Sequence, residues 1–227
     1  LKIPTYIYHE IRIGQAVEKL RKHPHLLVIG VTGSYGKTST KEMLATMLST
    51  KYRVLKTQKS QNSPIAIAET LLKDLTGDHT VFIVEMGAYK KGEIARMSAM
   101  TKPQIGVVTA VNEQHQDLFG SIETTMKAKY ELIAGLTGKN VAVMNADNKH
   151  VRLMGQWAIA DGKTVMWYSR DQKTEIYATD LKQTKDALSA IIHWEKHKKH
   201  LLVPLIGAHQ MSNVLAAIAA SMKAGMT

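Results

Sequence analysis

The fold of this chain is decided by residues 28–40, which read VIGVTGSYGKTST. An apolar run at 26–31 predicts a buried strand, and the apolar residues of 38–49 have the spacing of one helix face. Between them, Gly33 and Gly36 allow a tight turn whose N–H groups point at an anion, beside the positive end of the helix. The stretch therefore predicts a strand, a phosphate-binding loop and a helix.

The polar residues of this loop have the types that bind a nucleotide. Lys37 would hold the β- and γ-phosphates of ATP, and the hydroxyl of Thr38 would bind Mg²⁺. Further ATP contacts are expected from loop residues on either side, namely Thr32, Ser34 and Ser39.

The loop departs from the common P-loop pattern at one position. That pattern has a glycine five residues before the second glycine, where this chain has Val31, with Gly30 one place earlier. The alternative is a glycine-rich strand-to-helix turn in which GKT occurs by chance. The strand before the loop and the helix after it favour a variant P-loop.

Strands and helices alternate along the rest of the chain. Further apolar strands are expected at 53–57, 80–86, 104–109, 140–145 and 164–168. Helices are expected between them, at 64–75, 92–100, 122–136 and 149–157. This order predicts an α/β fold, a P-loop-type and mainly parallel sheet with helices on both faces. A small antiparallel β addition and a closing helix follow, from segments at 176–181, 188–194, 201–205 and 210–224.

The length of 227 residues and the 44% hydrophobic content allow one core. Residues 1–25 are expected to be a lead-in with a short helix at 13–22, and 26–227 a domain that contains the β addition at 174–206. No run reaches the roughly 20 apolar residues of a membrane helix, and no signal peptide is visible. Cysteine is absent, which fits the cytoplasm. Because the chain begins with Leu, we expect a piece of a longer protein.

The formal net charge is +11. Much of it lies in patches at 19–22, 51–59 and 195–200, with few aromatic residues between the basic ones. Nucleic-acid binding is therefore not expected, since bases stack on aromatic side chains. An acidic small substrate, another anionic partner or a solvated surface each explain the charge.

Four segments resemble, in order, those of the Mur ligases, which add amino acids to the peptidoglycan precursor. They are TGSYGKTSTKEML at 32–44, VEMGAYKKGEI at 84–94, TAVNEQHQDLFGS at 109–121 and KAKYEL at 127–132. The resemblance covers the family's central ATP-binding domain, whereas its N-terminal UDP-substrate domain and C-terminal ligase domain are absent. The forms EMGA, GEI and FGS are most similar to the branch that joins D-alanyl-D-alanine to a UDP-muramoyl tripeptide.

The resemblance implies a site for two Mg²⁺ ions. Glu85 would bind the first ion together with Thr38, and His115 would bind the second. Lys129 would also bind the second ion, after reaction with CO₂ has turned it into a carbamate. Each residue also has a plainer interpretation: Glu85 could cap a helix or pair with Lys90, His115 could be a surface residue, and Lys129 could be a solvated helix lysine.

Two further positions bear on these roles. Lys127 is two residues from Lys129 and would face elsewhere on the helix, so it is the natural control. Asn62 lies where the family has an asparagine-rich loop near the substrate, although Gln61 replaces the first of the usual pair. Asn62 could equally cap the helix that starts at Pro64.

The segment GAHQMSNVLAA, at 207–217, resembles the part of the family that lies against adenine. It makes His209 and Asn213 candidate adenine neighbours, although Gln210 replaces an expected asparagine. Asn145 and Asp147 follow a strand and could contact the nucleotide. Polar residues at a helix start or in a turn would explain the same residues without a ligand.

The implied activity is ATP-dependent amide-bond formation through an acyl phosphate, with Lys37, His115 and Lys129 as catalytic residues. The implied partners are a UDP-linked muramoyl peptide and D-alanyl-D-alanine, and the central domain alone is expected to be inactive. The alternatives are a non-catalytic or regulatory ATP-binding module, a folylpolyglutamate synthase-like amide ligase, and a P-loop kinase. A GTPase is disfavoured because no NKxD motif is present.

Overall fold

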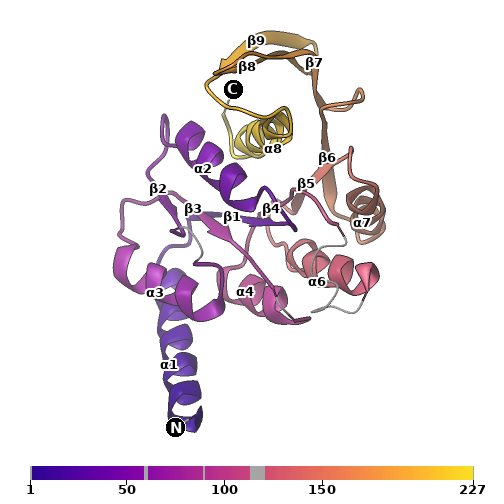
Figure 1. Ribbon diagram of the computed structural model, residues 1–227. Coiled ribbons are helices and arrows are strands. Elements are labelled where there is room, and N and C mark those ends of the chain that lie inside the picture. Colours follow the sequence, from indigo (N-terminus) through magenta and orange to yellow (C-terminus); the bar gives the residue numbers. More distant parts are fainter. Residues whose placement is uncertain (1, 59–60, 89, 113–120, 227) are drawn as a thin grey trace.

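One large sheet runs through the centre of the molecule (Figure 1). The computed structural model describes residues 2–58, 61–88, 90–112 and 121–226, and within this part the strands form a nine-stranded sheet in the order β2-β3-β1-β4-β5-β6-β7-β8-β9. Its parallel portion consists of β1 (Leu27–Thr32), β2 (Val54–Lys56), β3 (Val81–Glu85), β4 (Ile105–Val108), β5 (Val141–Asn145) and β6 (Thr164–Ser169). The carboxyl ends of these strands lie at one edge, where α/β proteins bind ligands.

Helices cover both faces of the sheet (Figure 1). One face carries α2 (Lys37–Leu48) and α8 (Gln210–Lys223). The other face carries α1 (Lys2–Arg21), α3 (Pro64–Asp74), α4 (Glu93–Thr101), α6 (Ile122–Ala134) and α7 (Lys149–Ala160). Successive strand residues point to opposite faces, so the nearly continuous apolar strands feed two separate cores.

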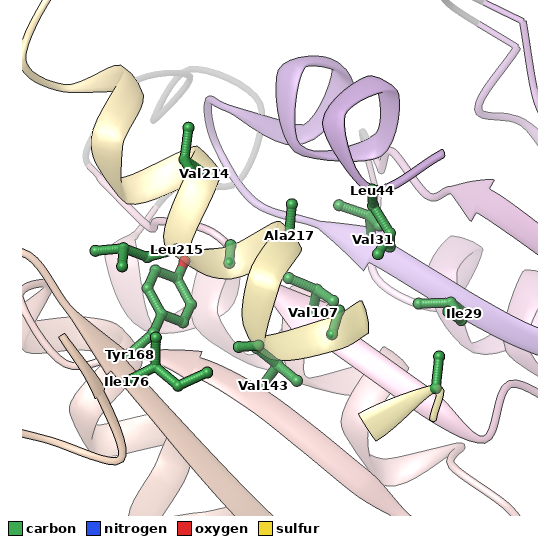
Figure 2. Close-up of a cluster of buried hydrophobic side chains, with 14 of the residues drawn as sticks. Ile29, Val31, Leu44, Val107, Val143, Tyr168, Ile176, Val214, Leu215 and Ala217 are labelled. Atoms are coloured by element: carbon green, nitrogen blue, oxygen red, sulfur yellow. The ribbon is translucent and has the colours of Figure 1, made fainter. Parts of the chain in front are cut away.

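The core under α8 joins distant parts of the chain (Figure 2). Val214 and Leu215 of α8 belong to the same buried cluster as Tyr168 of β6, whereas Leu44 of α2 lies close to Val31 of β1. All five side chains are nearly or completely buried. This packing holds the beginnings of α2 and α8 near the same edge of the sheet.

The antiparallel strands continue the main sheet. They are β7 (Ile176–Gln183), β8 (Leu188–Trp194) and β9 (His197–Val203). β7 pairs in parallel with the end of β6, where Tyr168 is opposite Ile176, and antiparallel with β8. The α/β fold class predicted from the sequence, with its antiparallel addition, is confirmed.

Two elements begin well before the residue that the sequence indicates. α1 spans 20 residues instead of 13–22 alone. Contacts with neighbouring helices stabilise it: the Arg12 guanidinium lies 2.6 Å from a carboxylate oxygen of Glu69 on α3, and Ala16 is fully buried. β9 starts at His197 rather than 201, because its basic first half pairs in full register with β8. None of the described helices combines the length and apolar character needed to cross a bilayer.

Candidate nucleotide-binding and catalytic site

Two glycines shape the loop between β1 and α2. Gly33 and Gly36 have φ angles of 151° and 81°, which side chains rarely allow. A Cβ atom on Gly33 would lie 2.0 Å from the hydroxyl of Thr109, and one on Gly36 would lie 2.4 Å from Oδ1 of Asn213. The turn therefore needs glycine for its backbone conformation and for the close approach of β4 and α8.

Lys37 begins α2 and folds back over the loop. Its ammonium group donates a hydrogen bond of 2.8 Å to the carbonyl oxygen of Gly33. Burial lowers the pKa of Lys37, and the nearby Glu85 carboxylate acts in the opposite direction. A phosphate group in the loop would meet this ammonium group and the N-terminal end of α2.

Glu85 ends β3 and is only 2% exposed. Its Oε2 atom accepts a hydrogen bond of 3.0 Å from the hydroxyl of Thr38 and lies 3.2 Å from the ammonium group of Lys41. Neither plainer interpretation of Glu85 is observed: the N-cap of α4 is Gly92, and among the described residues the ion-pair partner of Glu85 is Lys41 rather than Lys90. Glu85 and Thr38 thus form a pair of oxygen ligands beside the phosphate loop.

Lys129 of α6 is 6% exposed. Burial, and secondarily the charge of Lys37, lowers its pKa to about 8. Within the described ranges no hydrogen-bond or ion-pair partner of Lys129 is found. The plainer interpretation, a solvated lysine, describes Lys127 and not Lys129: Lys127 is exposed and its ammonium group lies 2.6 Å from a carboxylate oxygen of Glu123.

A periodic signal in the sequence marks both buried lysines. The buried residues of α6 include Thr125, Met126, Lys129, Leu132 and Ile133. Those of α2 are Thr40, Lys41, Leu44, Ala45 and Leu48. Each lysine stands on the apolar stripe of its helix, three or four residues from the next buried position. This spacing identifies Lys41, which the motifs alone do not single out.

A pocket of about 470 Å³ opens beside the loop. Of the residues expected to bind ATP, the pocket is lined by Gly36, Ser39, Asn145, His209 and Asn213. Asp147 and Gln210, which the sequence analysis discusses, also line it. The remaining lining residues are not indicated by the sequence; they are Tyr35, Thr109, Asn148, Arg170, Asp171 and Ser212. The strand ends and the start of α8 therefore converge on one nucleoside-sized cavity.

Hydrogen bonds fix the polar walls of this pocket. The amide of Asn145 donates to the carbonyl oxygen of Thr109 at 2.7 Å and accepts from the N–H of Asp147 at 2.9 Å. On the opposite wall the amide of Asn213 donates to Gln210 at 2.7 Å. Gln210 thus replaces asparagine without leaving Asn213 unsupported.

Other candidates lie next to the pocket rather than in it. Thr32 is fully buried and donates to the carbonyl oxygen of Met86 at 2.9 Å, so its side chain links β1 to the end of β3. The hydroxyl of Ser34 accepts from the N–H of Asn112 at 3.2 Å. Asn62 contacts Gly87, and the N-cap of α3 is Ser63.

The described residues contain no cluster of three or more His, Asp or Glu side chains that could hold a metal ion. His115 lies outside the described residues. A Mg²⁺ ion at Glu85 and Thr38 would therefore depend on phosphate and water oxygens for its other ligands, which is how proteins usually bind this ion. The donor set fits a magnesium nucleotide.

Replacing Lys129 with methionine is expected to stabilise the domain at neutral pH in buffer free of CO₂. The fold lowers the pKa of Lys129 from 10.5 to about 8, a cost of roughly 3 kcal/mol while the group is protonated. The wild-type free energy of unfolding should rise between about pH 8 and pH 10.5, because the folded state binds fewer protons there. Urea unfolding at pH 7 and above pH 10 measures both effects.

Lys127→Met is the matched control. It removes only an exposed pair and should change the free energy of unfolding little. A Lys129→Met protein that is less stable than wild type at pH 7 would contradict this account of a buried, unpaired lysine.

Comparison with known proteins identifies the family. The profile of the Mur ligase middle domain matches residues 31–221. Over 229 residues the chain is 33% identical to the UDP-N-acetylmuramoyl-tripeptide–D-alanyl-D-alanine ligase of Escherichia coli (strain K12), covering 100% of this chain and 50% of that protein. It is 37% identical over 201 residues to the ligase of the same name from Synechocystis sp., covering 88% of this chain and 41% of that protein.

Solved structures show the same fold. A crystal structure of MurF from Acinetobacter baumannii gives a TM-score of 0.90 at 24% identity over 96% of this chain and 47% of that one. MurF ligase from Thermotoga maritima in complex with ADP gives 0.86 at 24% identity over 96% of this chain and 50% of that one. The chain spans about half the length of the curated relatives it matches. It belongs to the Mur ligase family, and it corresponds to the middle domain of that family.

Proposed function

We propose that the complete protein carrying this domain is an ATP-dependent amide ligase of peptidoglycan precursor synthesis. It would join D-alanyl-D-alanine to a UDP-linked muramoyl tripeptide, the two substrates that the names of its curated relatives give for those proteins. We propose that it does so in the cytoplasm. The observation that carries the proposal is the meeting of the phosphate loop, the Thr38–Glu85 pair and the buried amine of Lys129 at one edge of the sheet. A simple nucleotide-binding module has no need of that amine.

ATP would bind with its phosphates in the loop and its nucleoside in the adjacent pocket. Lys37 and the N-terminal end of α2 would contact the phosphates, and Ser39 lies at the border of the pocket. Asn145, His209 and Asn213 also line this pocket, and we assign them to adenine and ribose. The structurally similar MurF ligase from Thermotoga maritima was solved in complex with ADP, which supports nucleotide binding by this domain.

We propose sites for two Mg²⁺ ions. Thr38 and Glu85 would hold one ion, and His115 with the carbamate of Lys129 would hold the other. Carbamate formation needs a neutral amine, which attacks CO₂ and loses a proton, and the lowered pKa of Lys129 favours that form. Bound Mg²⁺ would supply positive charge to the triphosphate during transfer.

The chemistry takes place in two steps. A carboxylate oxygen of the tripeptide attacks the γ-phosphorus, ADP leaves, and an acyl phosphate forms. The amine of D-alanyl-D-alanine then attacks the acyl carbon, phosphate leaves, and the nitrogen loses a proton. Lys37 would neutralise charge on the transferred phosphoryl group. Asn62, which lies between β2 and α3 and contacts Gly87 after β3, would contact the substrate.

Further domains complete this scheme in our proposal, an N-terminal one for the UDP substrate and a C-terminal one that closes the site. The test is ADP release by the complete protein with each substrate supplied and omitted. Release that requires both the UDP-muramoyl tripeptide and D-alanyl-D-alanine is the expected result. ATP binding without such release would support a regulatory module, and release stimulated by folate and glutamate would support the folylpolyglutamate synthase-like alternative.

A further inference from the structure

Lys41 is a buried cation that the proposed chemistry does not use. Its side chain is completely buried, although lysine is almost never buried without a partner. It follows Thr38 by three positions on α2, so both side chains lie on the helix face toward Glu85. Its ammonium group lies 3.2 Å from Oε2 of Glu85, the oxygen that also accepts the Thr38 hydrogen bond.

Other charges and hydrogen bonds support this contact. Lys41 lies 3.6 Å from a carboxylate oxygen of Glu42, and the other oxygen of Glu42 contacts Lys56 at the end of β2. The next residue, Thr57, accepts a hydrogen bond of 3.0 Å from the N–H of Glu85. Charges of alternating sign therefore run from Lys56 through Glu42 and Lys41 to Glu85. The hydrogen bond to Thr57, next to Lys56, also holds the backbone of Glu85 in place.

A carboxylate as buried as Glu85 is kept from water, so it needs a counter-charge within the protein. The hydroxyl of Thr38 is neutral and cannot supply that charge. Lys41 supplies it and also fixes one oxygen of the carboxylate in place. The ammonium group of Lys41 is close enough to Glu85 to repel a Mg²⁺ ion bound there. The carboxylate of Glu42 lies beside Lys41 and reduces this repulsion.

We propose that Lys41 is a positioning residue that holds the Glu85 carboxylate in the orientation that receives the Mg²⁺ of the nucleotide, with Glu42 supporting Lys41 from behind. This inference rests on the proposed role of Glu85 as a magnesium ligand. It assigns Lys41 no contact with ATP, in contrast to Lys37, one helical turn earlier. Removing Lys41 should therefore affect what Mg²⁺ adds to ATP binding and leave metal-free binding nearly unchanged.

The test is calorimetric titration of the chain with ATP, once in excess MgCl₂ and once in EDTA. In Lys41→Met the tightening of ATP binding by Mg²⁺ should fall by about 10-fold or more, the usual effect of removing a group that orients a metal ligand. Lys41→Arg should retain part of this tightening by Mg²⁺. In Glu42→Gln the tightening should fall by about threefold, because Glu42 acts on Glu85 only through Lys41. Lys73→Met, the same change at an exposed position of α3, should match wild type.

The variants separate this inference from the proposed function. If wild type shows no Mg²⁺ effect, or Glu85→Gln retains it, the magnesium assignment itself is wrong. If Glu85→Gln loses the effect but Lys41→Met retains it, or loses affinity equally in EDTA, the positioning role is wrong. Should Lys41→Met fail to fold, the partly exposed Glu42 decides: Glu42→Gln binding of ATP in MgCl₂ equal to wild type would overturn the proposal.

Discussion

ATP binding is expected to weaken at least about 100-fold when Lys37 is replaced by alanine, since hydrogen bonds from a charged donor contribute roughly 1.5–3 kcal/mol each. The Lys37 ammonium group lies over the loop and would donate to oxygens of two phosphates. Its hydrogen bonds in the structure are to loop carbonyls, at 2.8 Å to Gly33 and 3.5 Å to Ser34. Calorimetry of the chain with ATP and MgCl₂ measures the loss.

The same variant should remain folded. Lys37 is partly exposed, and its hydrogen bonds within the described part of the chain stay inside the loop, so the thermal midpoint should stay close to that of wild type. Lys51→Ala, at an exposed lysine beyond the end of α2, is the control and should bind ATP normally. Unchanged affinity in a folded Lys37→Ala protein would exclude this loop as the phosphate site.

Turnover of the complete protein is expected to fall on the order of 10³-fold when Lys129 is replaced by alanine, an effect comparable to losing a group that stabilises transition-state charge. The buried amine points to no protein partner among the described residues, and its carbamate would lie near Lys37 and the phosphates. Lys127→Ala should retain activity, because Lys127 pairs with Glu123 on the exposed side of α6. Steady-state ADP release measures both variants.

The carbamate can also be observed directly. Carbon-13-labelled bicarbonate should give a carbamate resonance in wild type and in Lys127→Ala, and none in Lys129→Ala. The pKa of about 8 predicts that the resonance grows as the pH rises through that value, since only the neutral amine reacts with CO₂. Full activity of Lys129→Ala, or a resonance that persists in it, would contradict the assignment.

Local patterns were sufficient to predict the order of elements and the phosphate loop. The glycines, the apolar runs and the helix spacing act over a few residues, so the sequence reports them directly. Contacts between distant segments were not predictable in this way. The hydroxyl of Thr109 beside Gly33 and the amide of Asn213 beside Gly36 depend on how β4 and α8 pack against the loop.

The surroundings of the two buried lysines, Lys41 and Lys129, also depend on contacts between distant segments. The motif containing Lys129 leaves a solvated lysine open as an alternative. The position of Lys129 on the apolar stripe of α6 favours burial, and the packing of α6 in the structure shows it. The helical spacing marks Lys41 as buried, but the sequence does not show its partner, because Glu85 is on β3, far along the chain. The extension of α1 toward Lys2 was also missed, since contacts with α3 stabilise it and the residues near its start have modest helix propensity.

The central claim is that ATP activates a carboxylate of the muramoyl tripeptide as an acyl phosphate. The most direct test supplies the complete protein with tripeptide substrate whose terminal carboxylate carries oxygen-18, together with ATP, MgCl₂ and D-alanyl-D-alanine. The account predicts that one labelled oxygen appears in the inorganic phosphate for each amide bond formed. Amide formation that releases unlabelled phosphate would show that the carboxylate never received the phosphoryl group and would contradict the account.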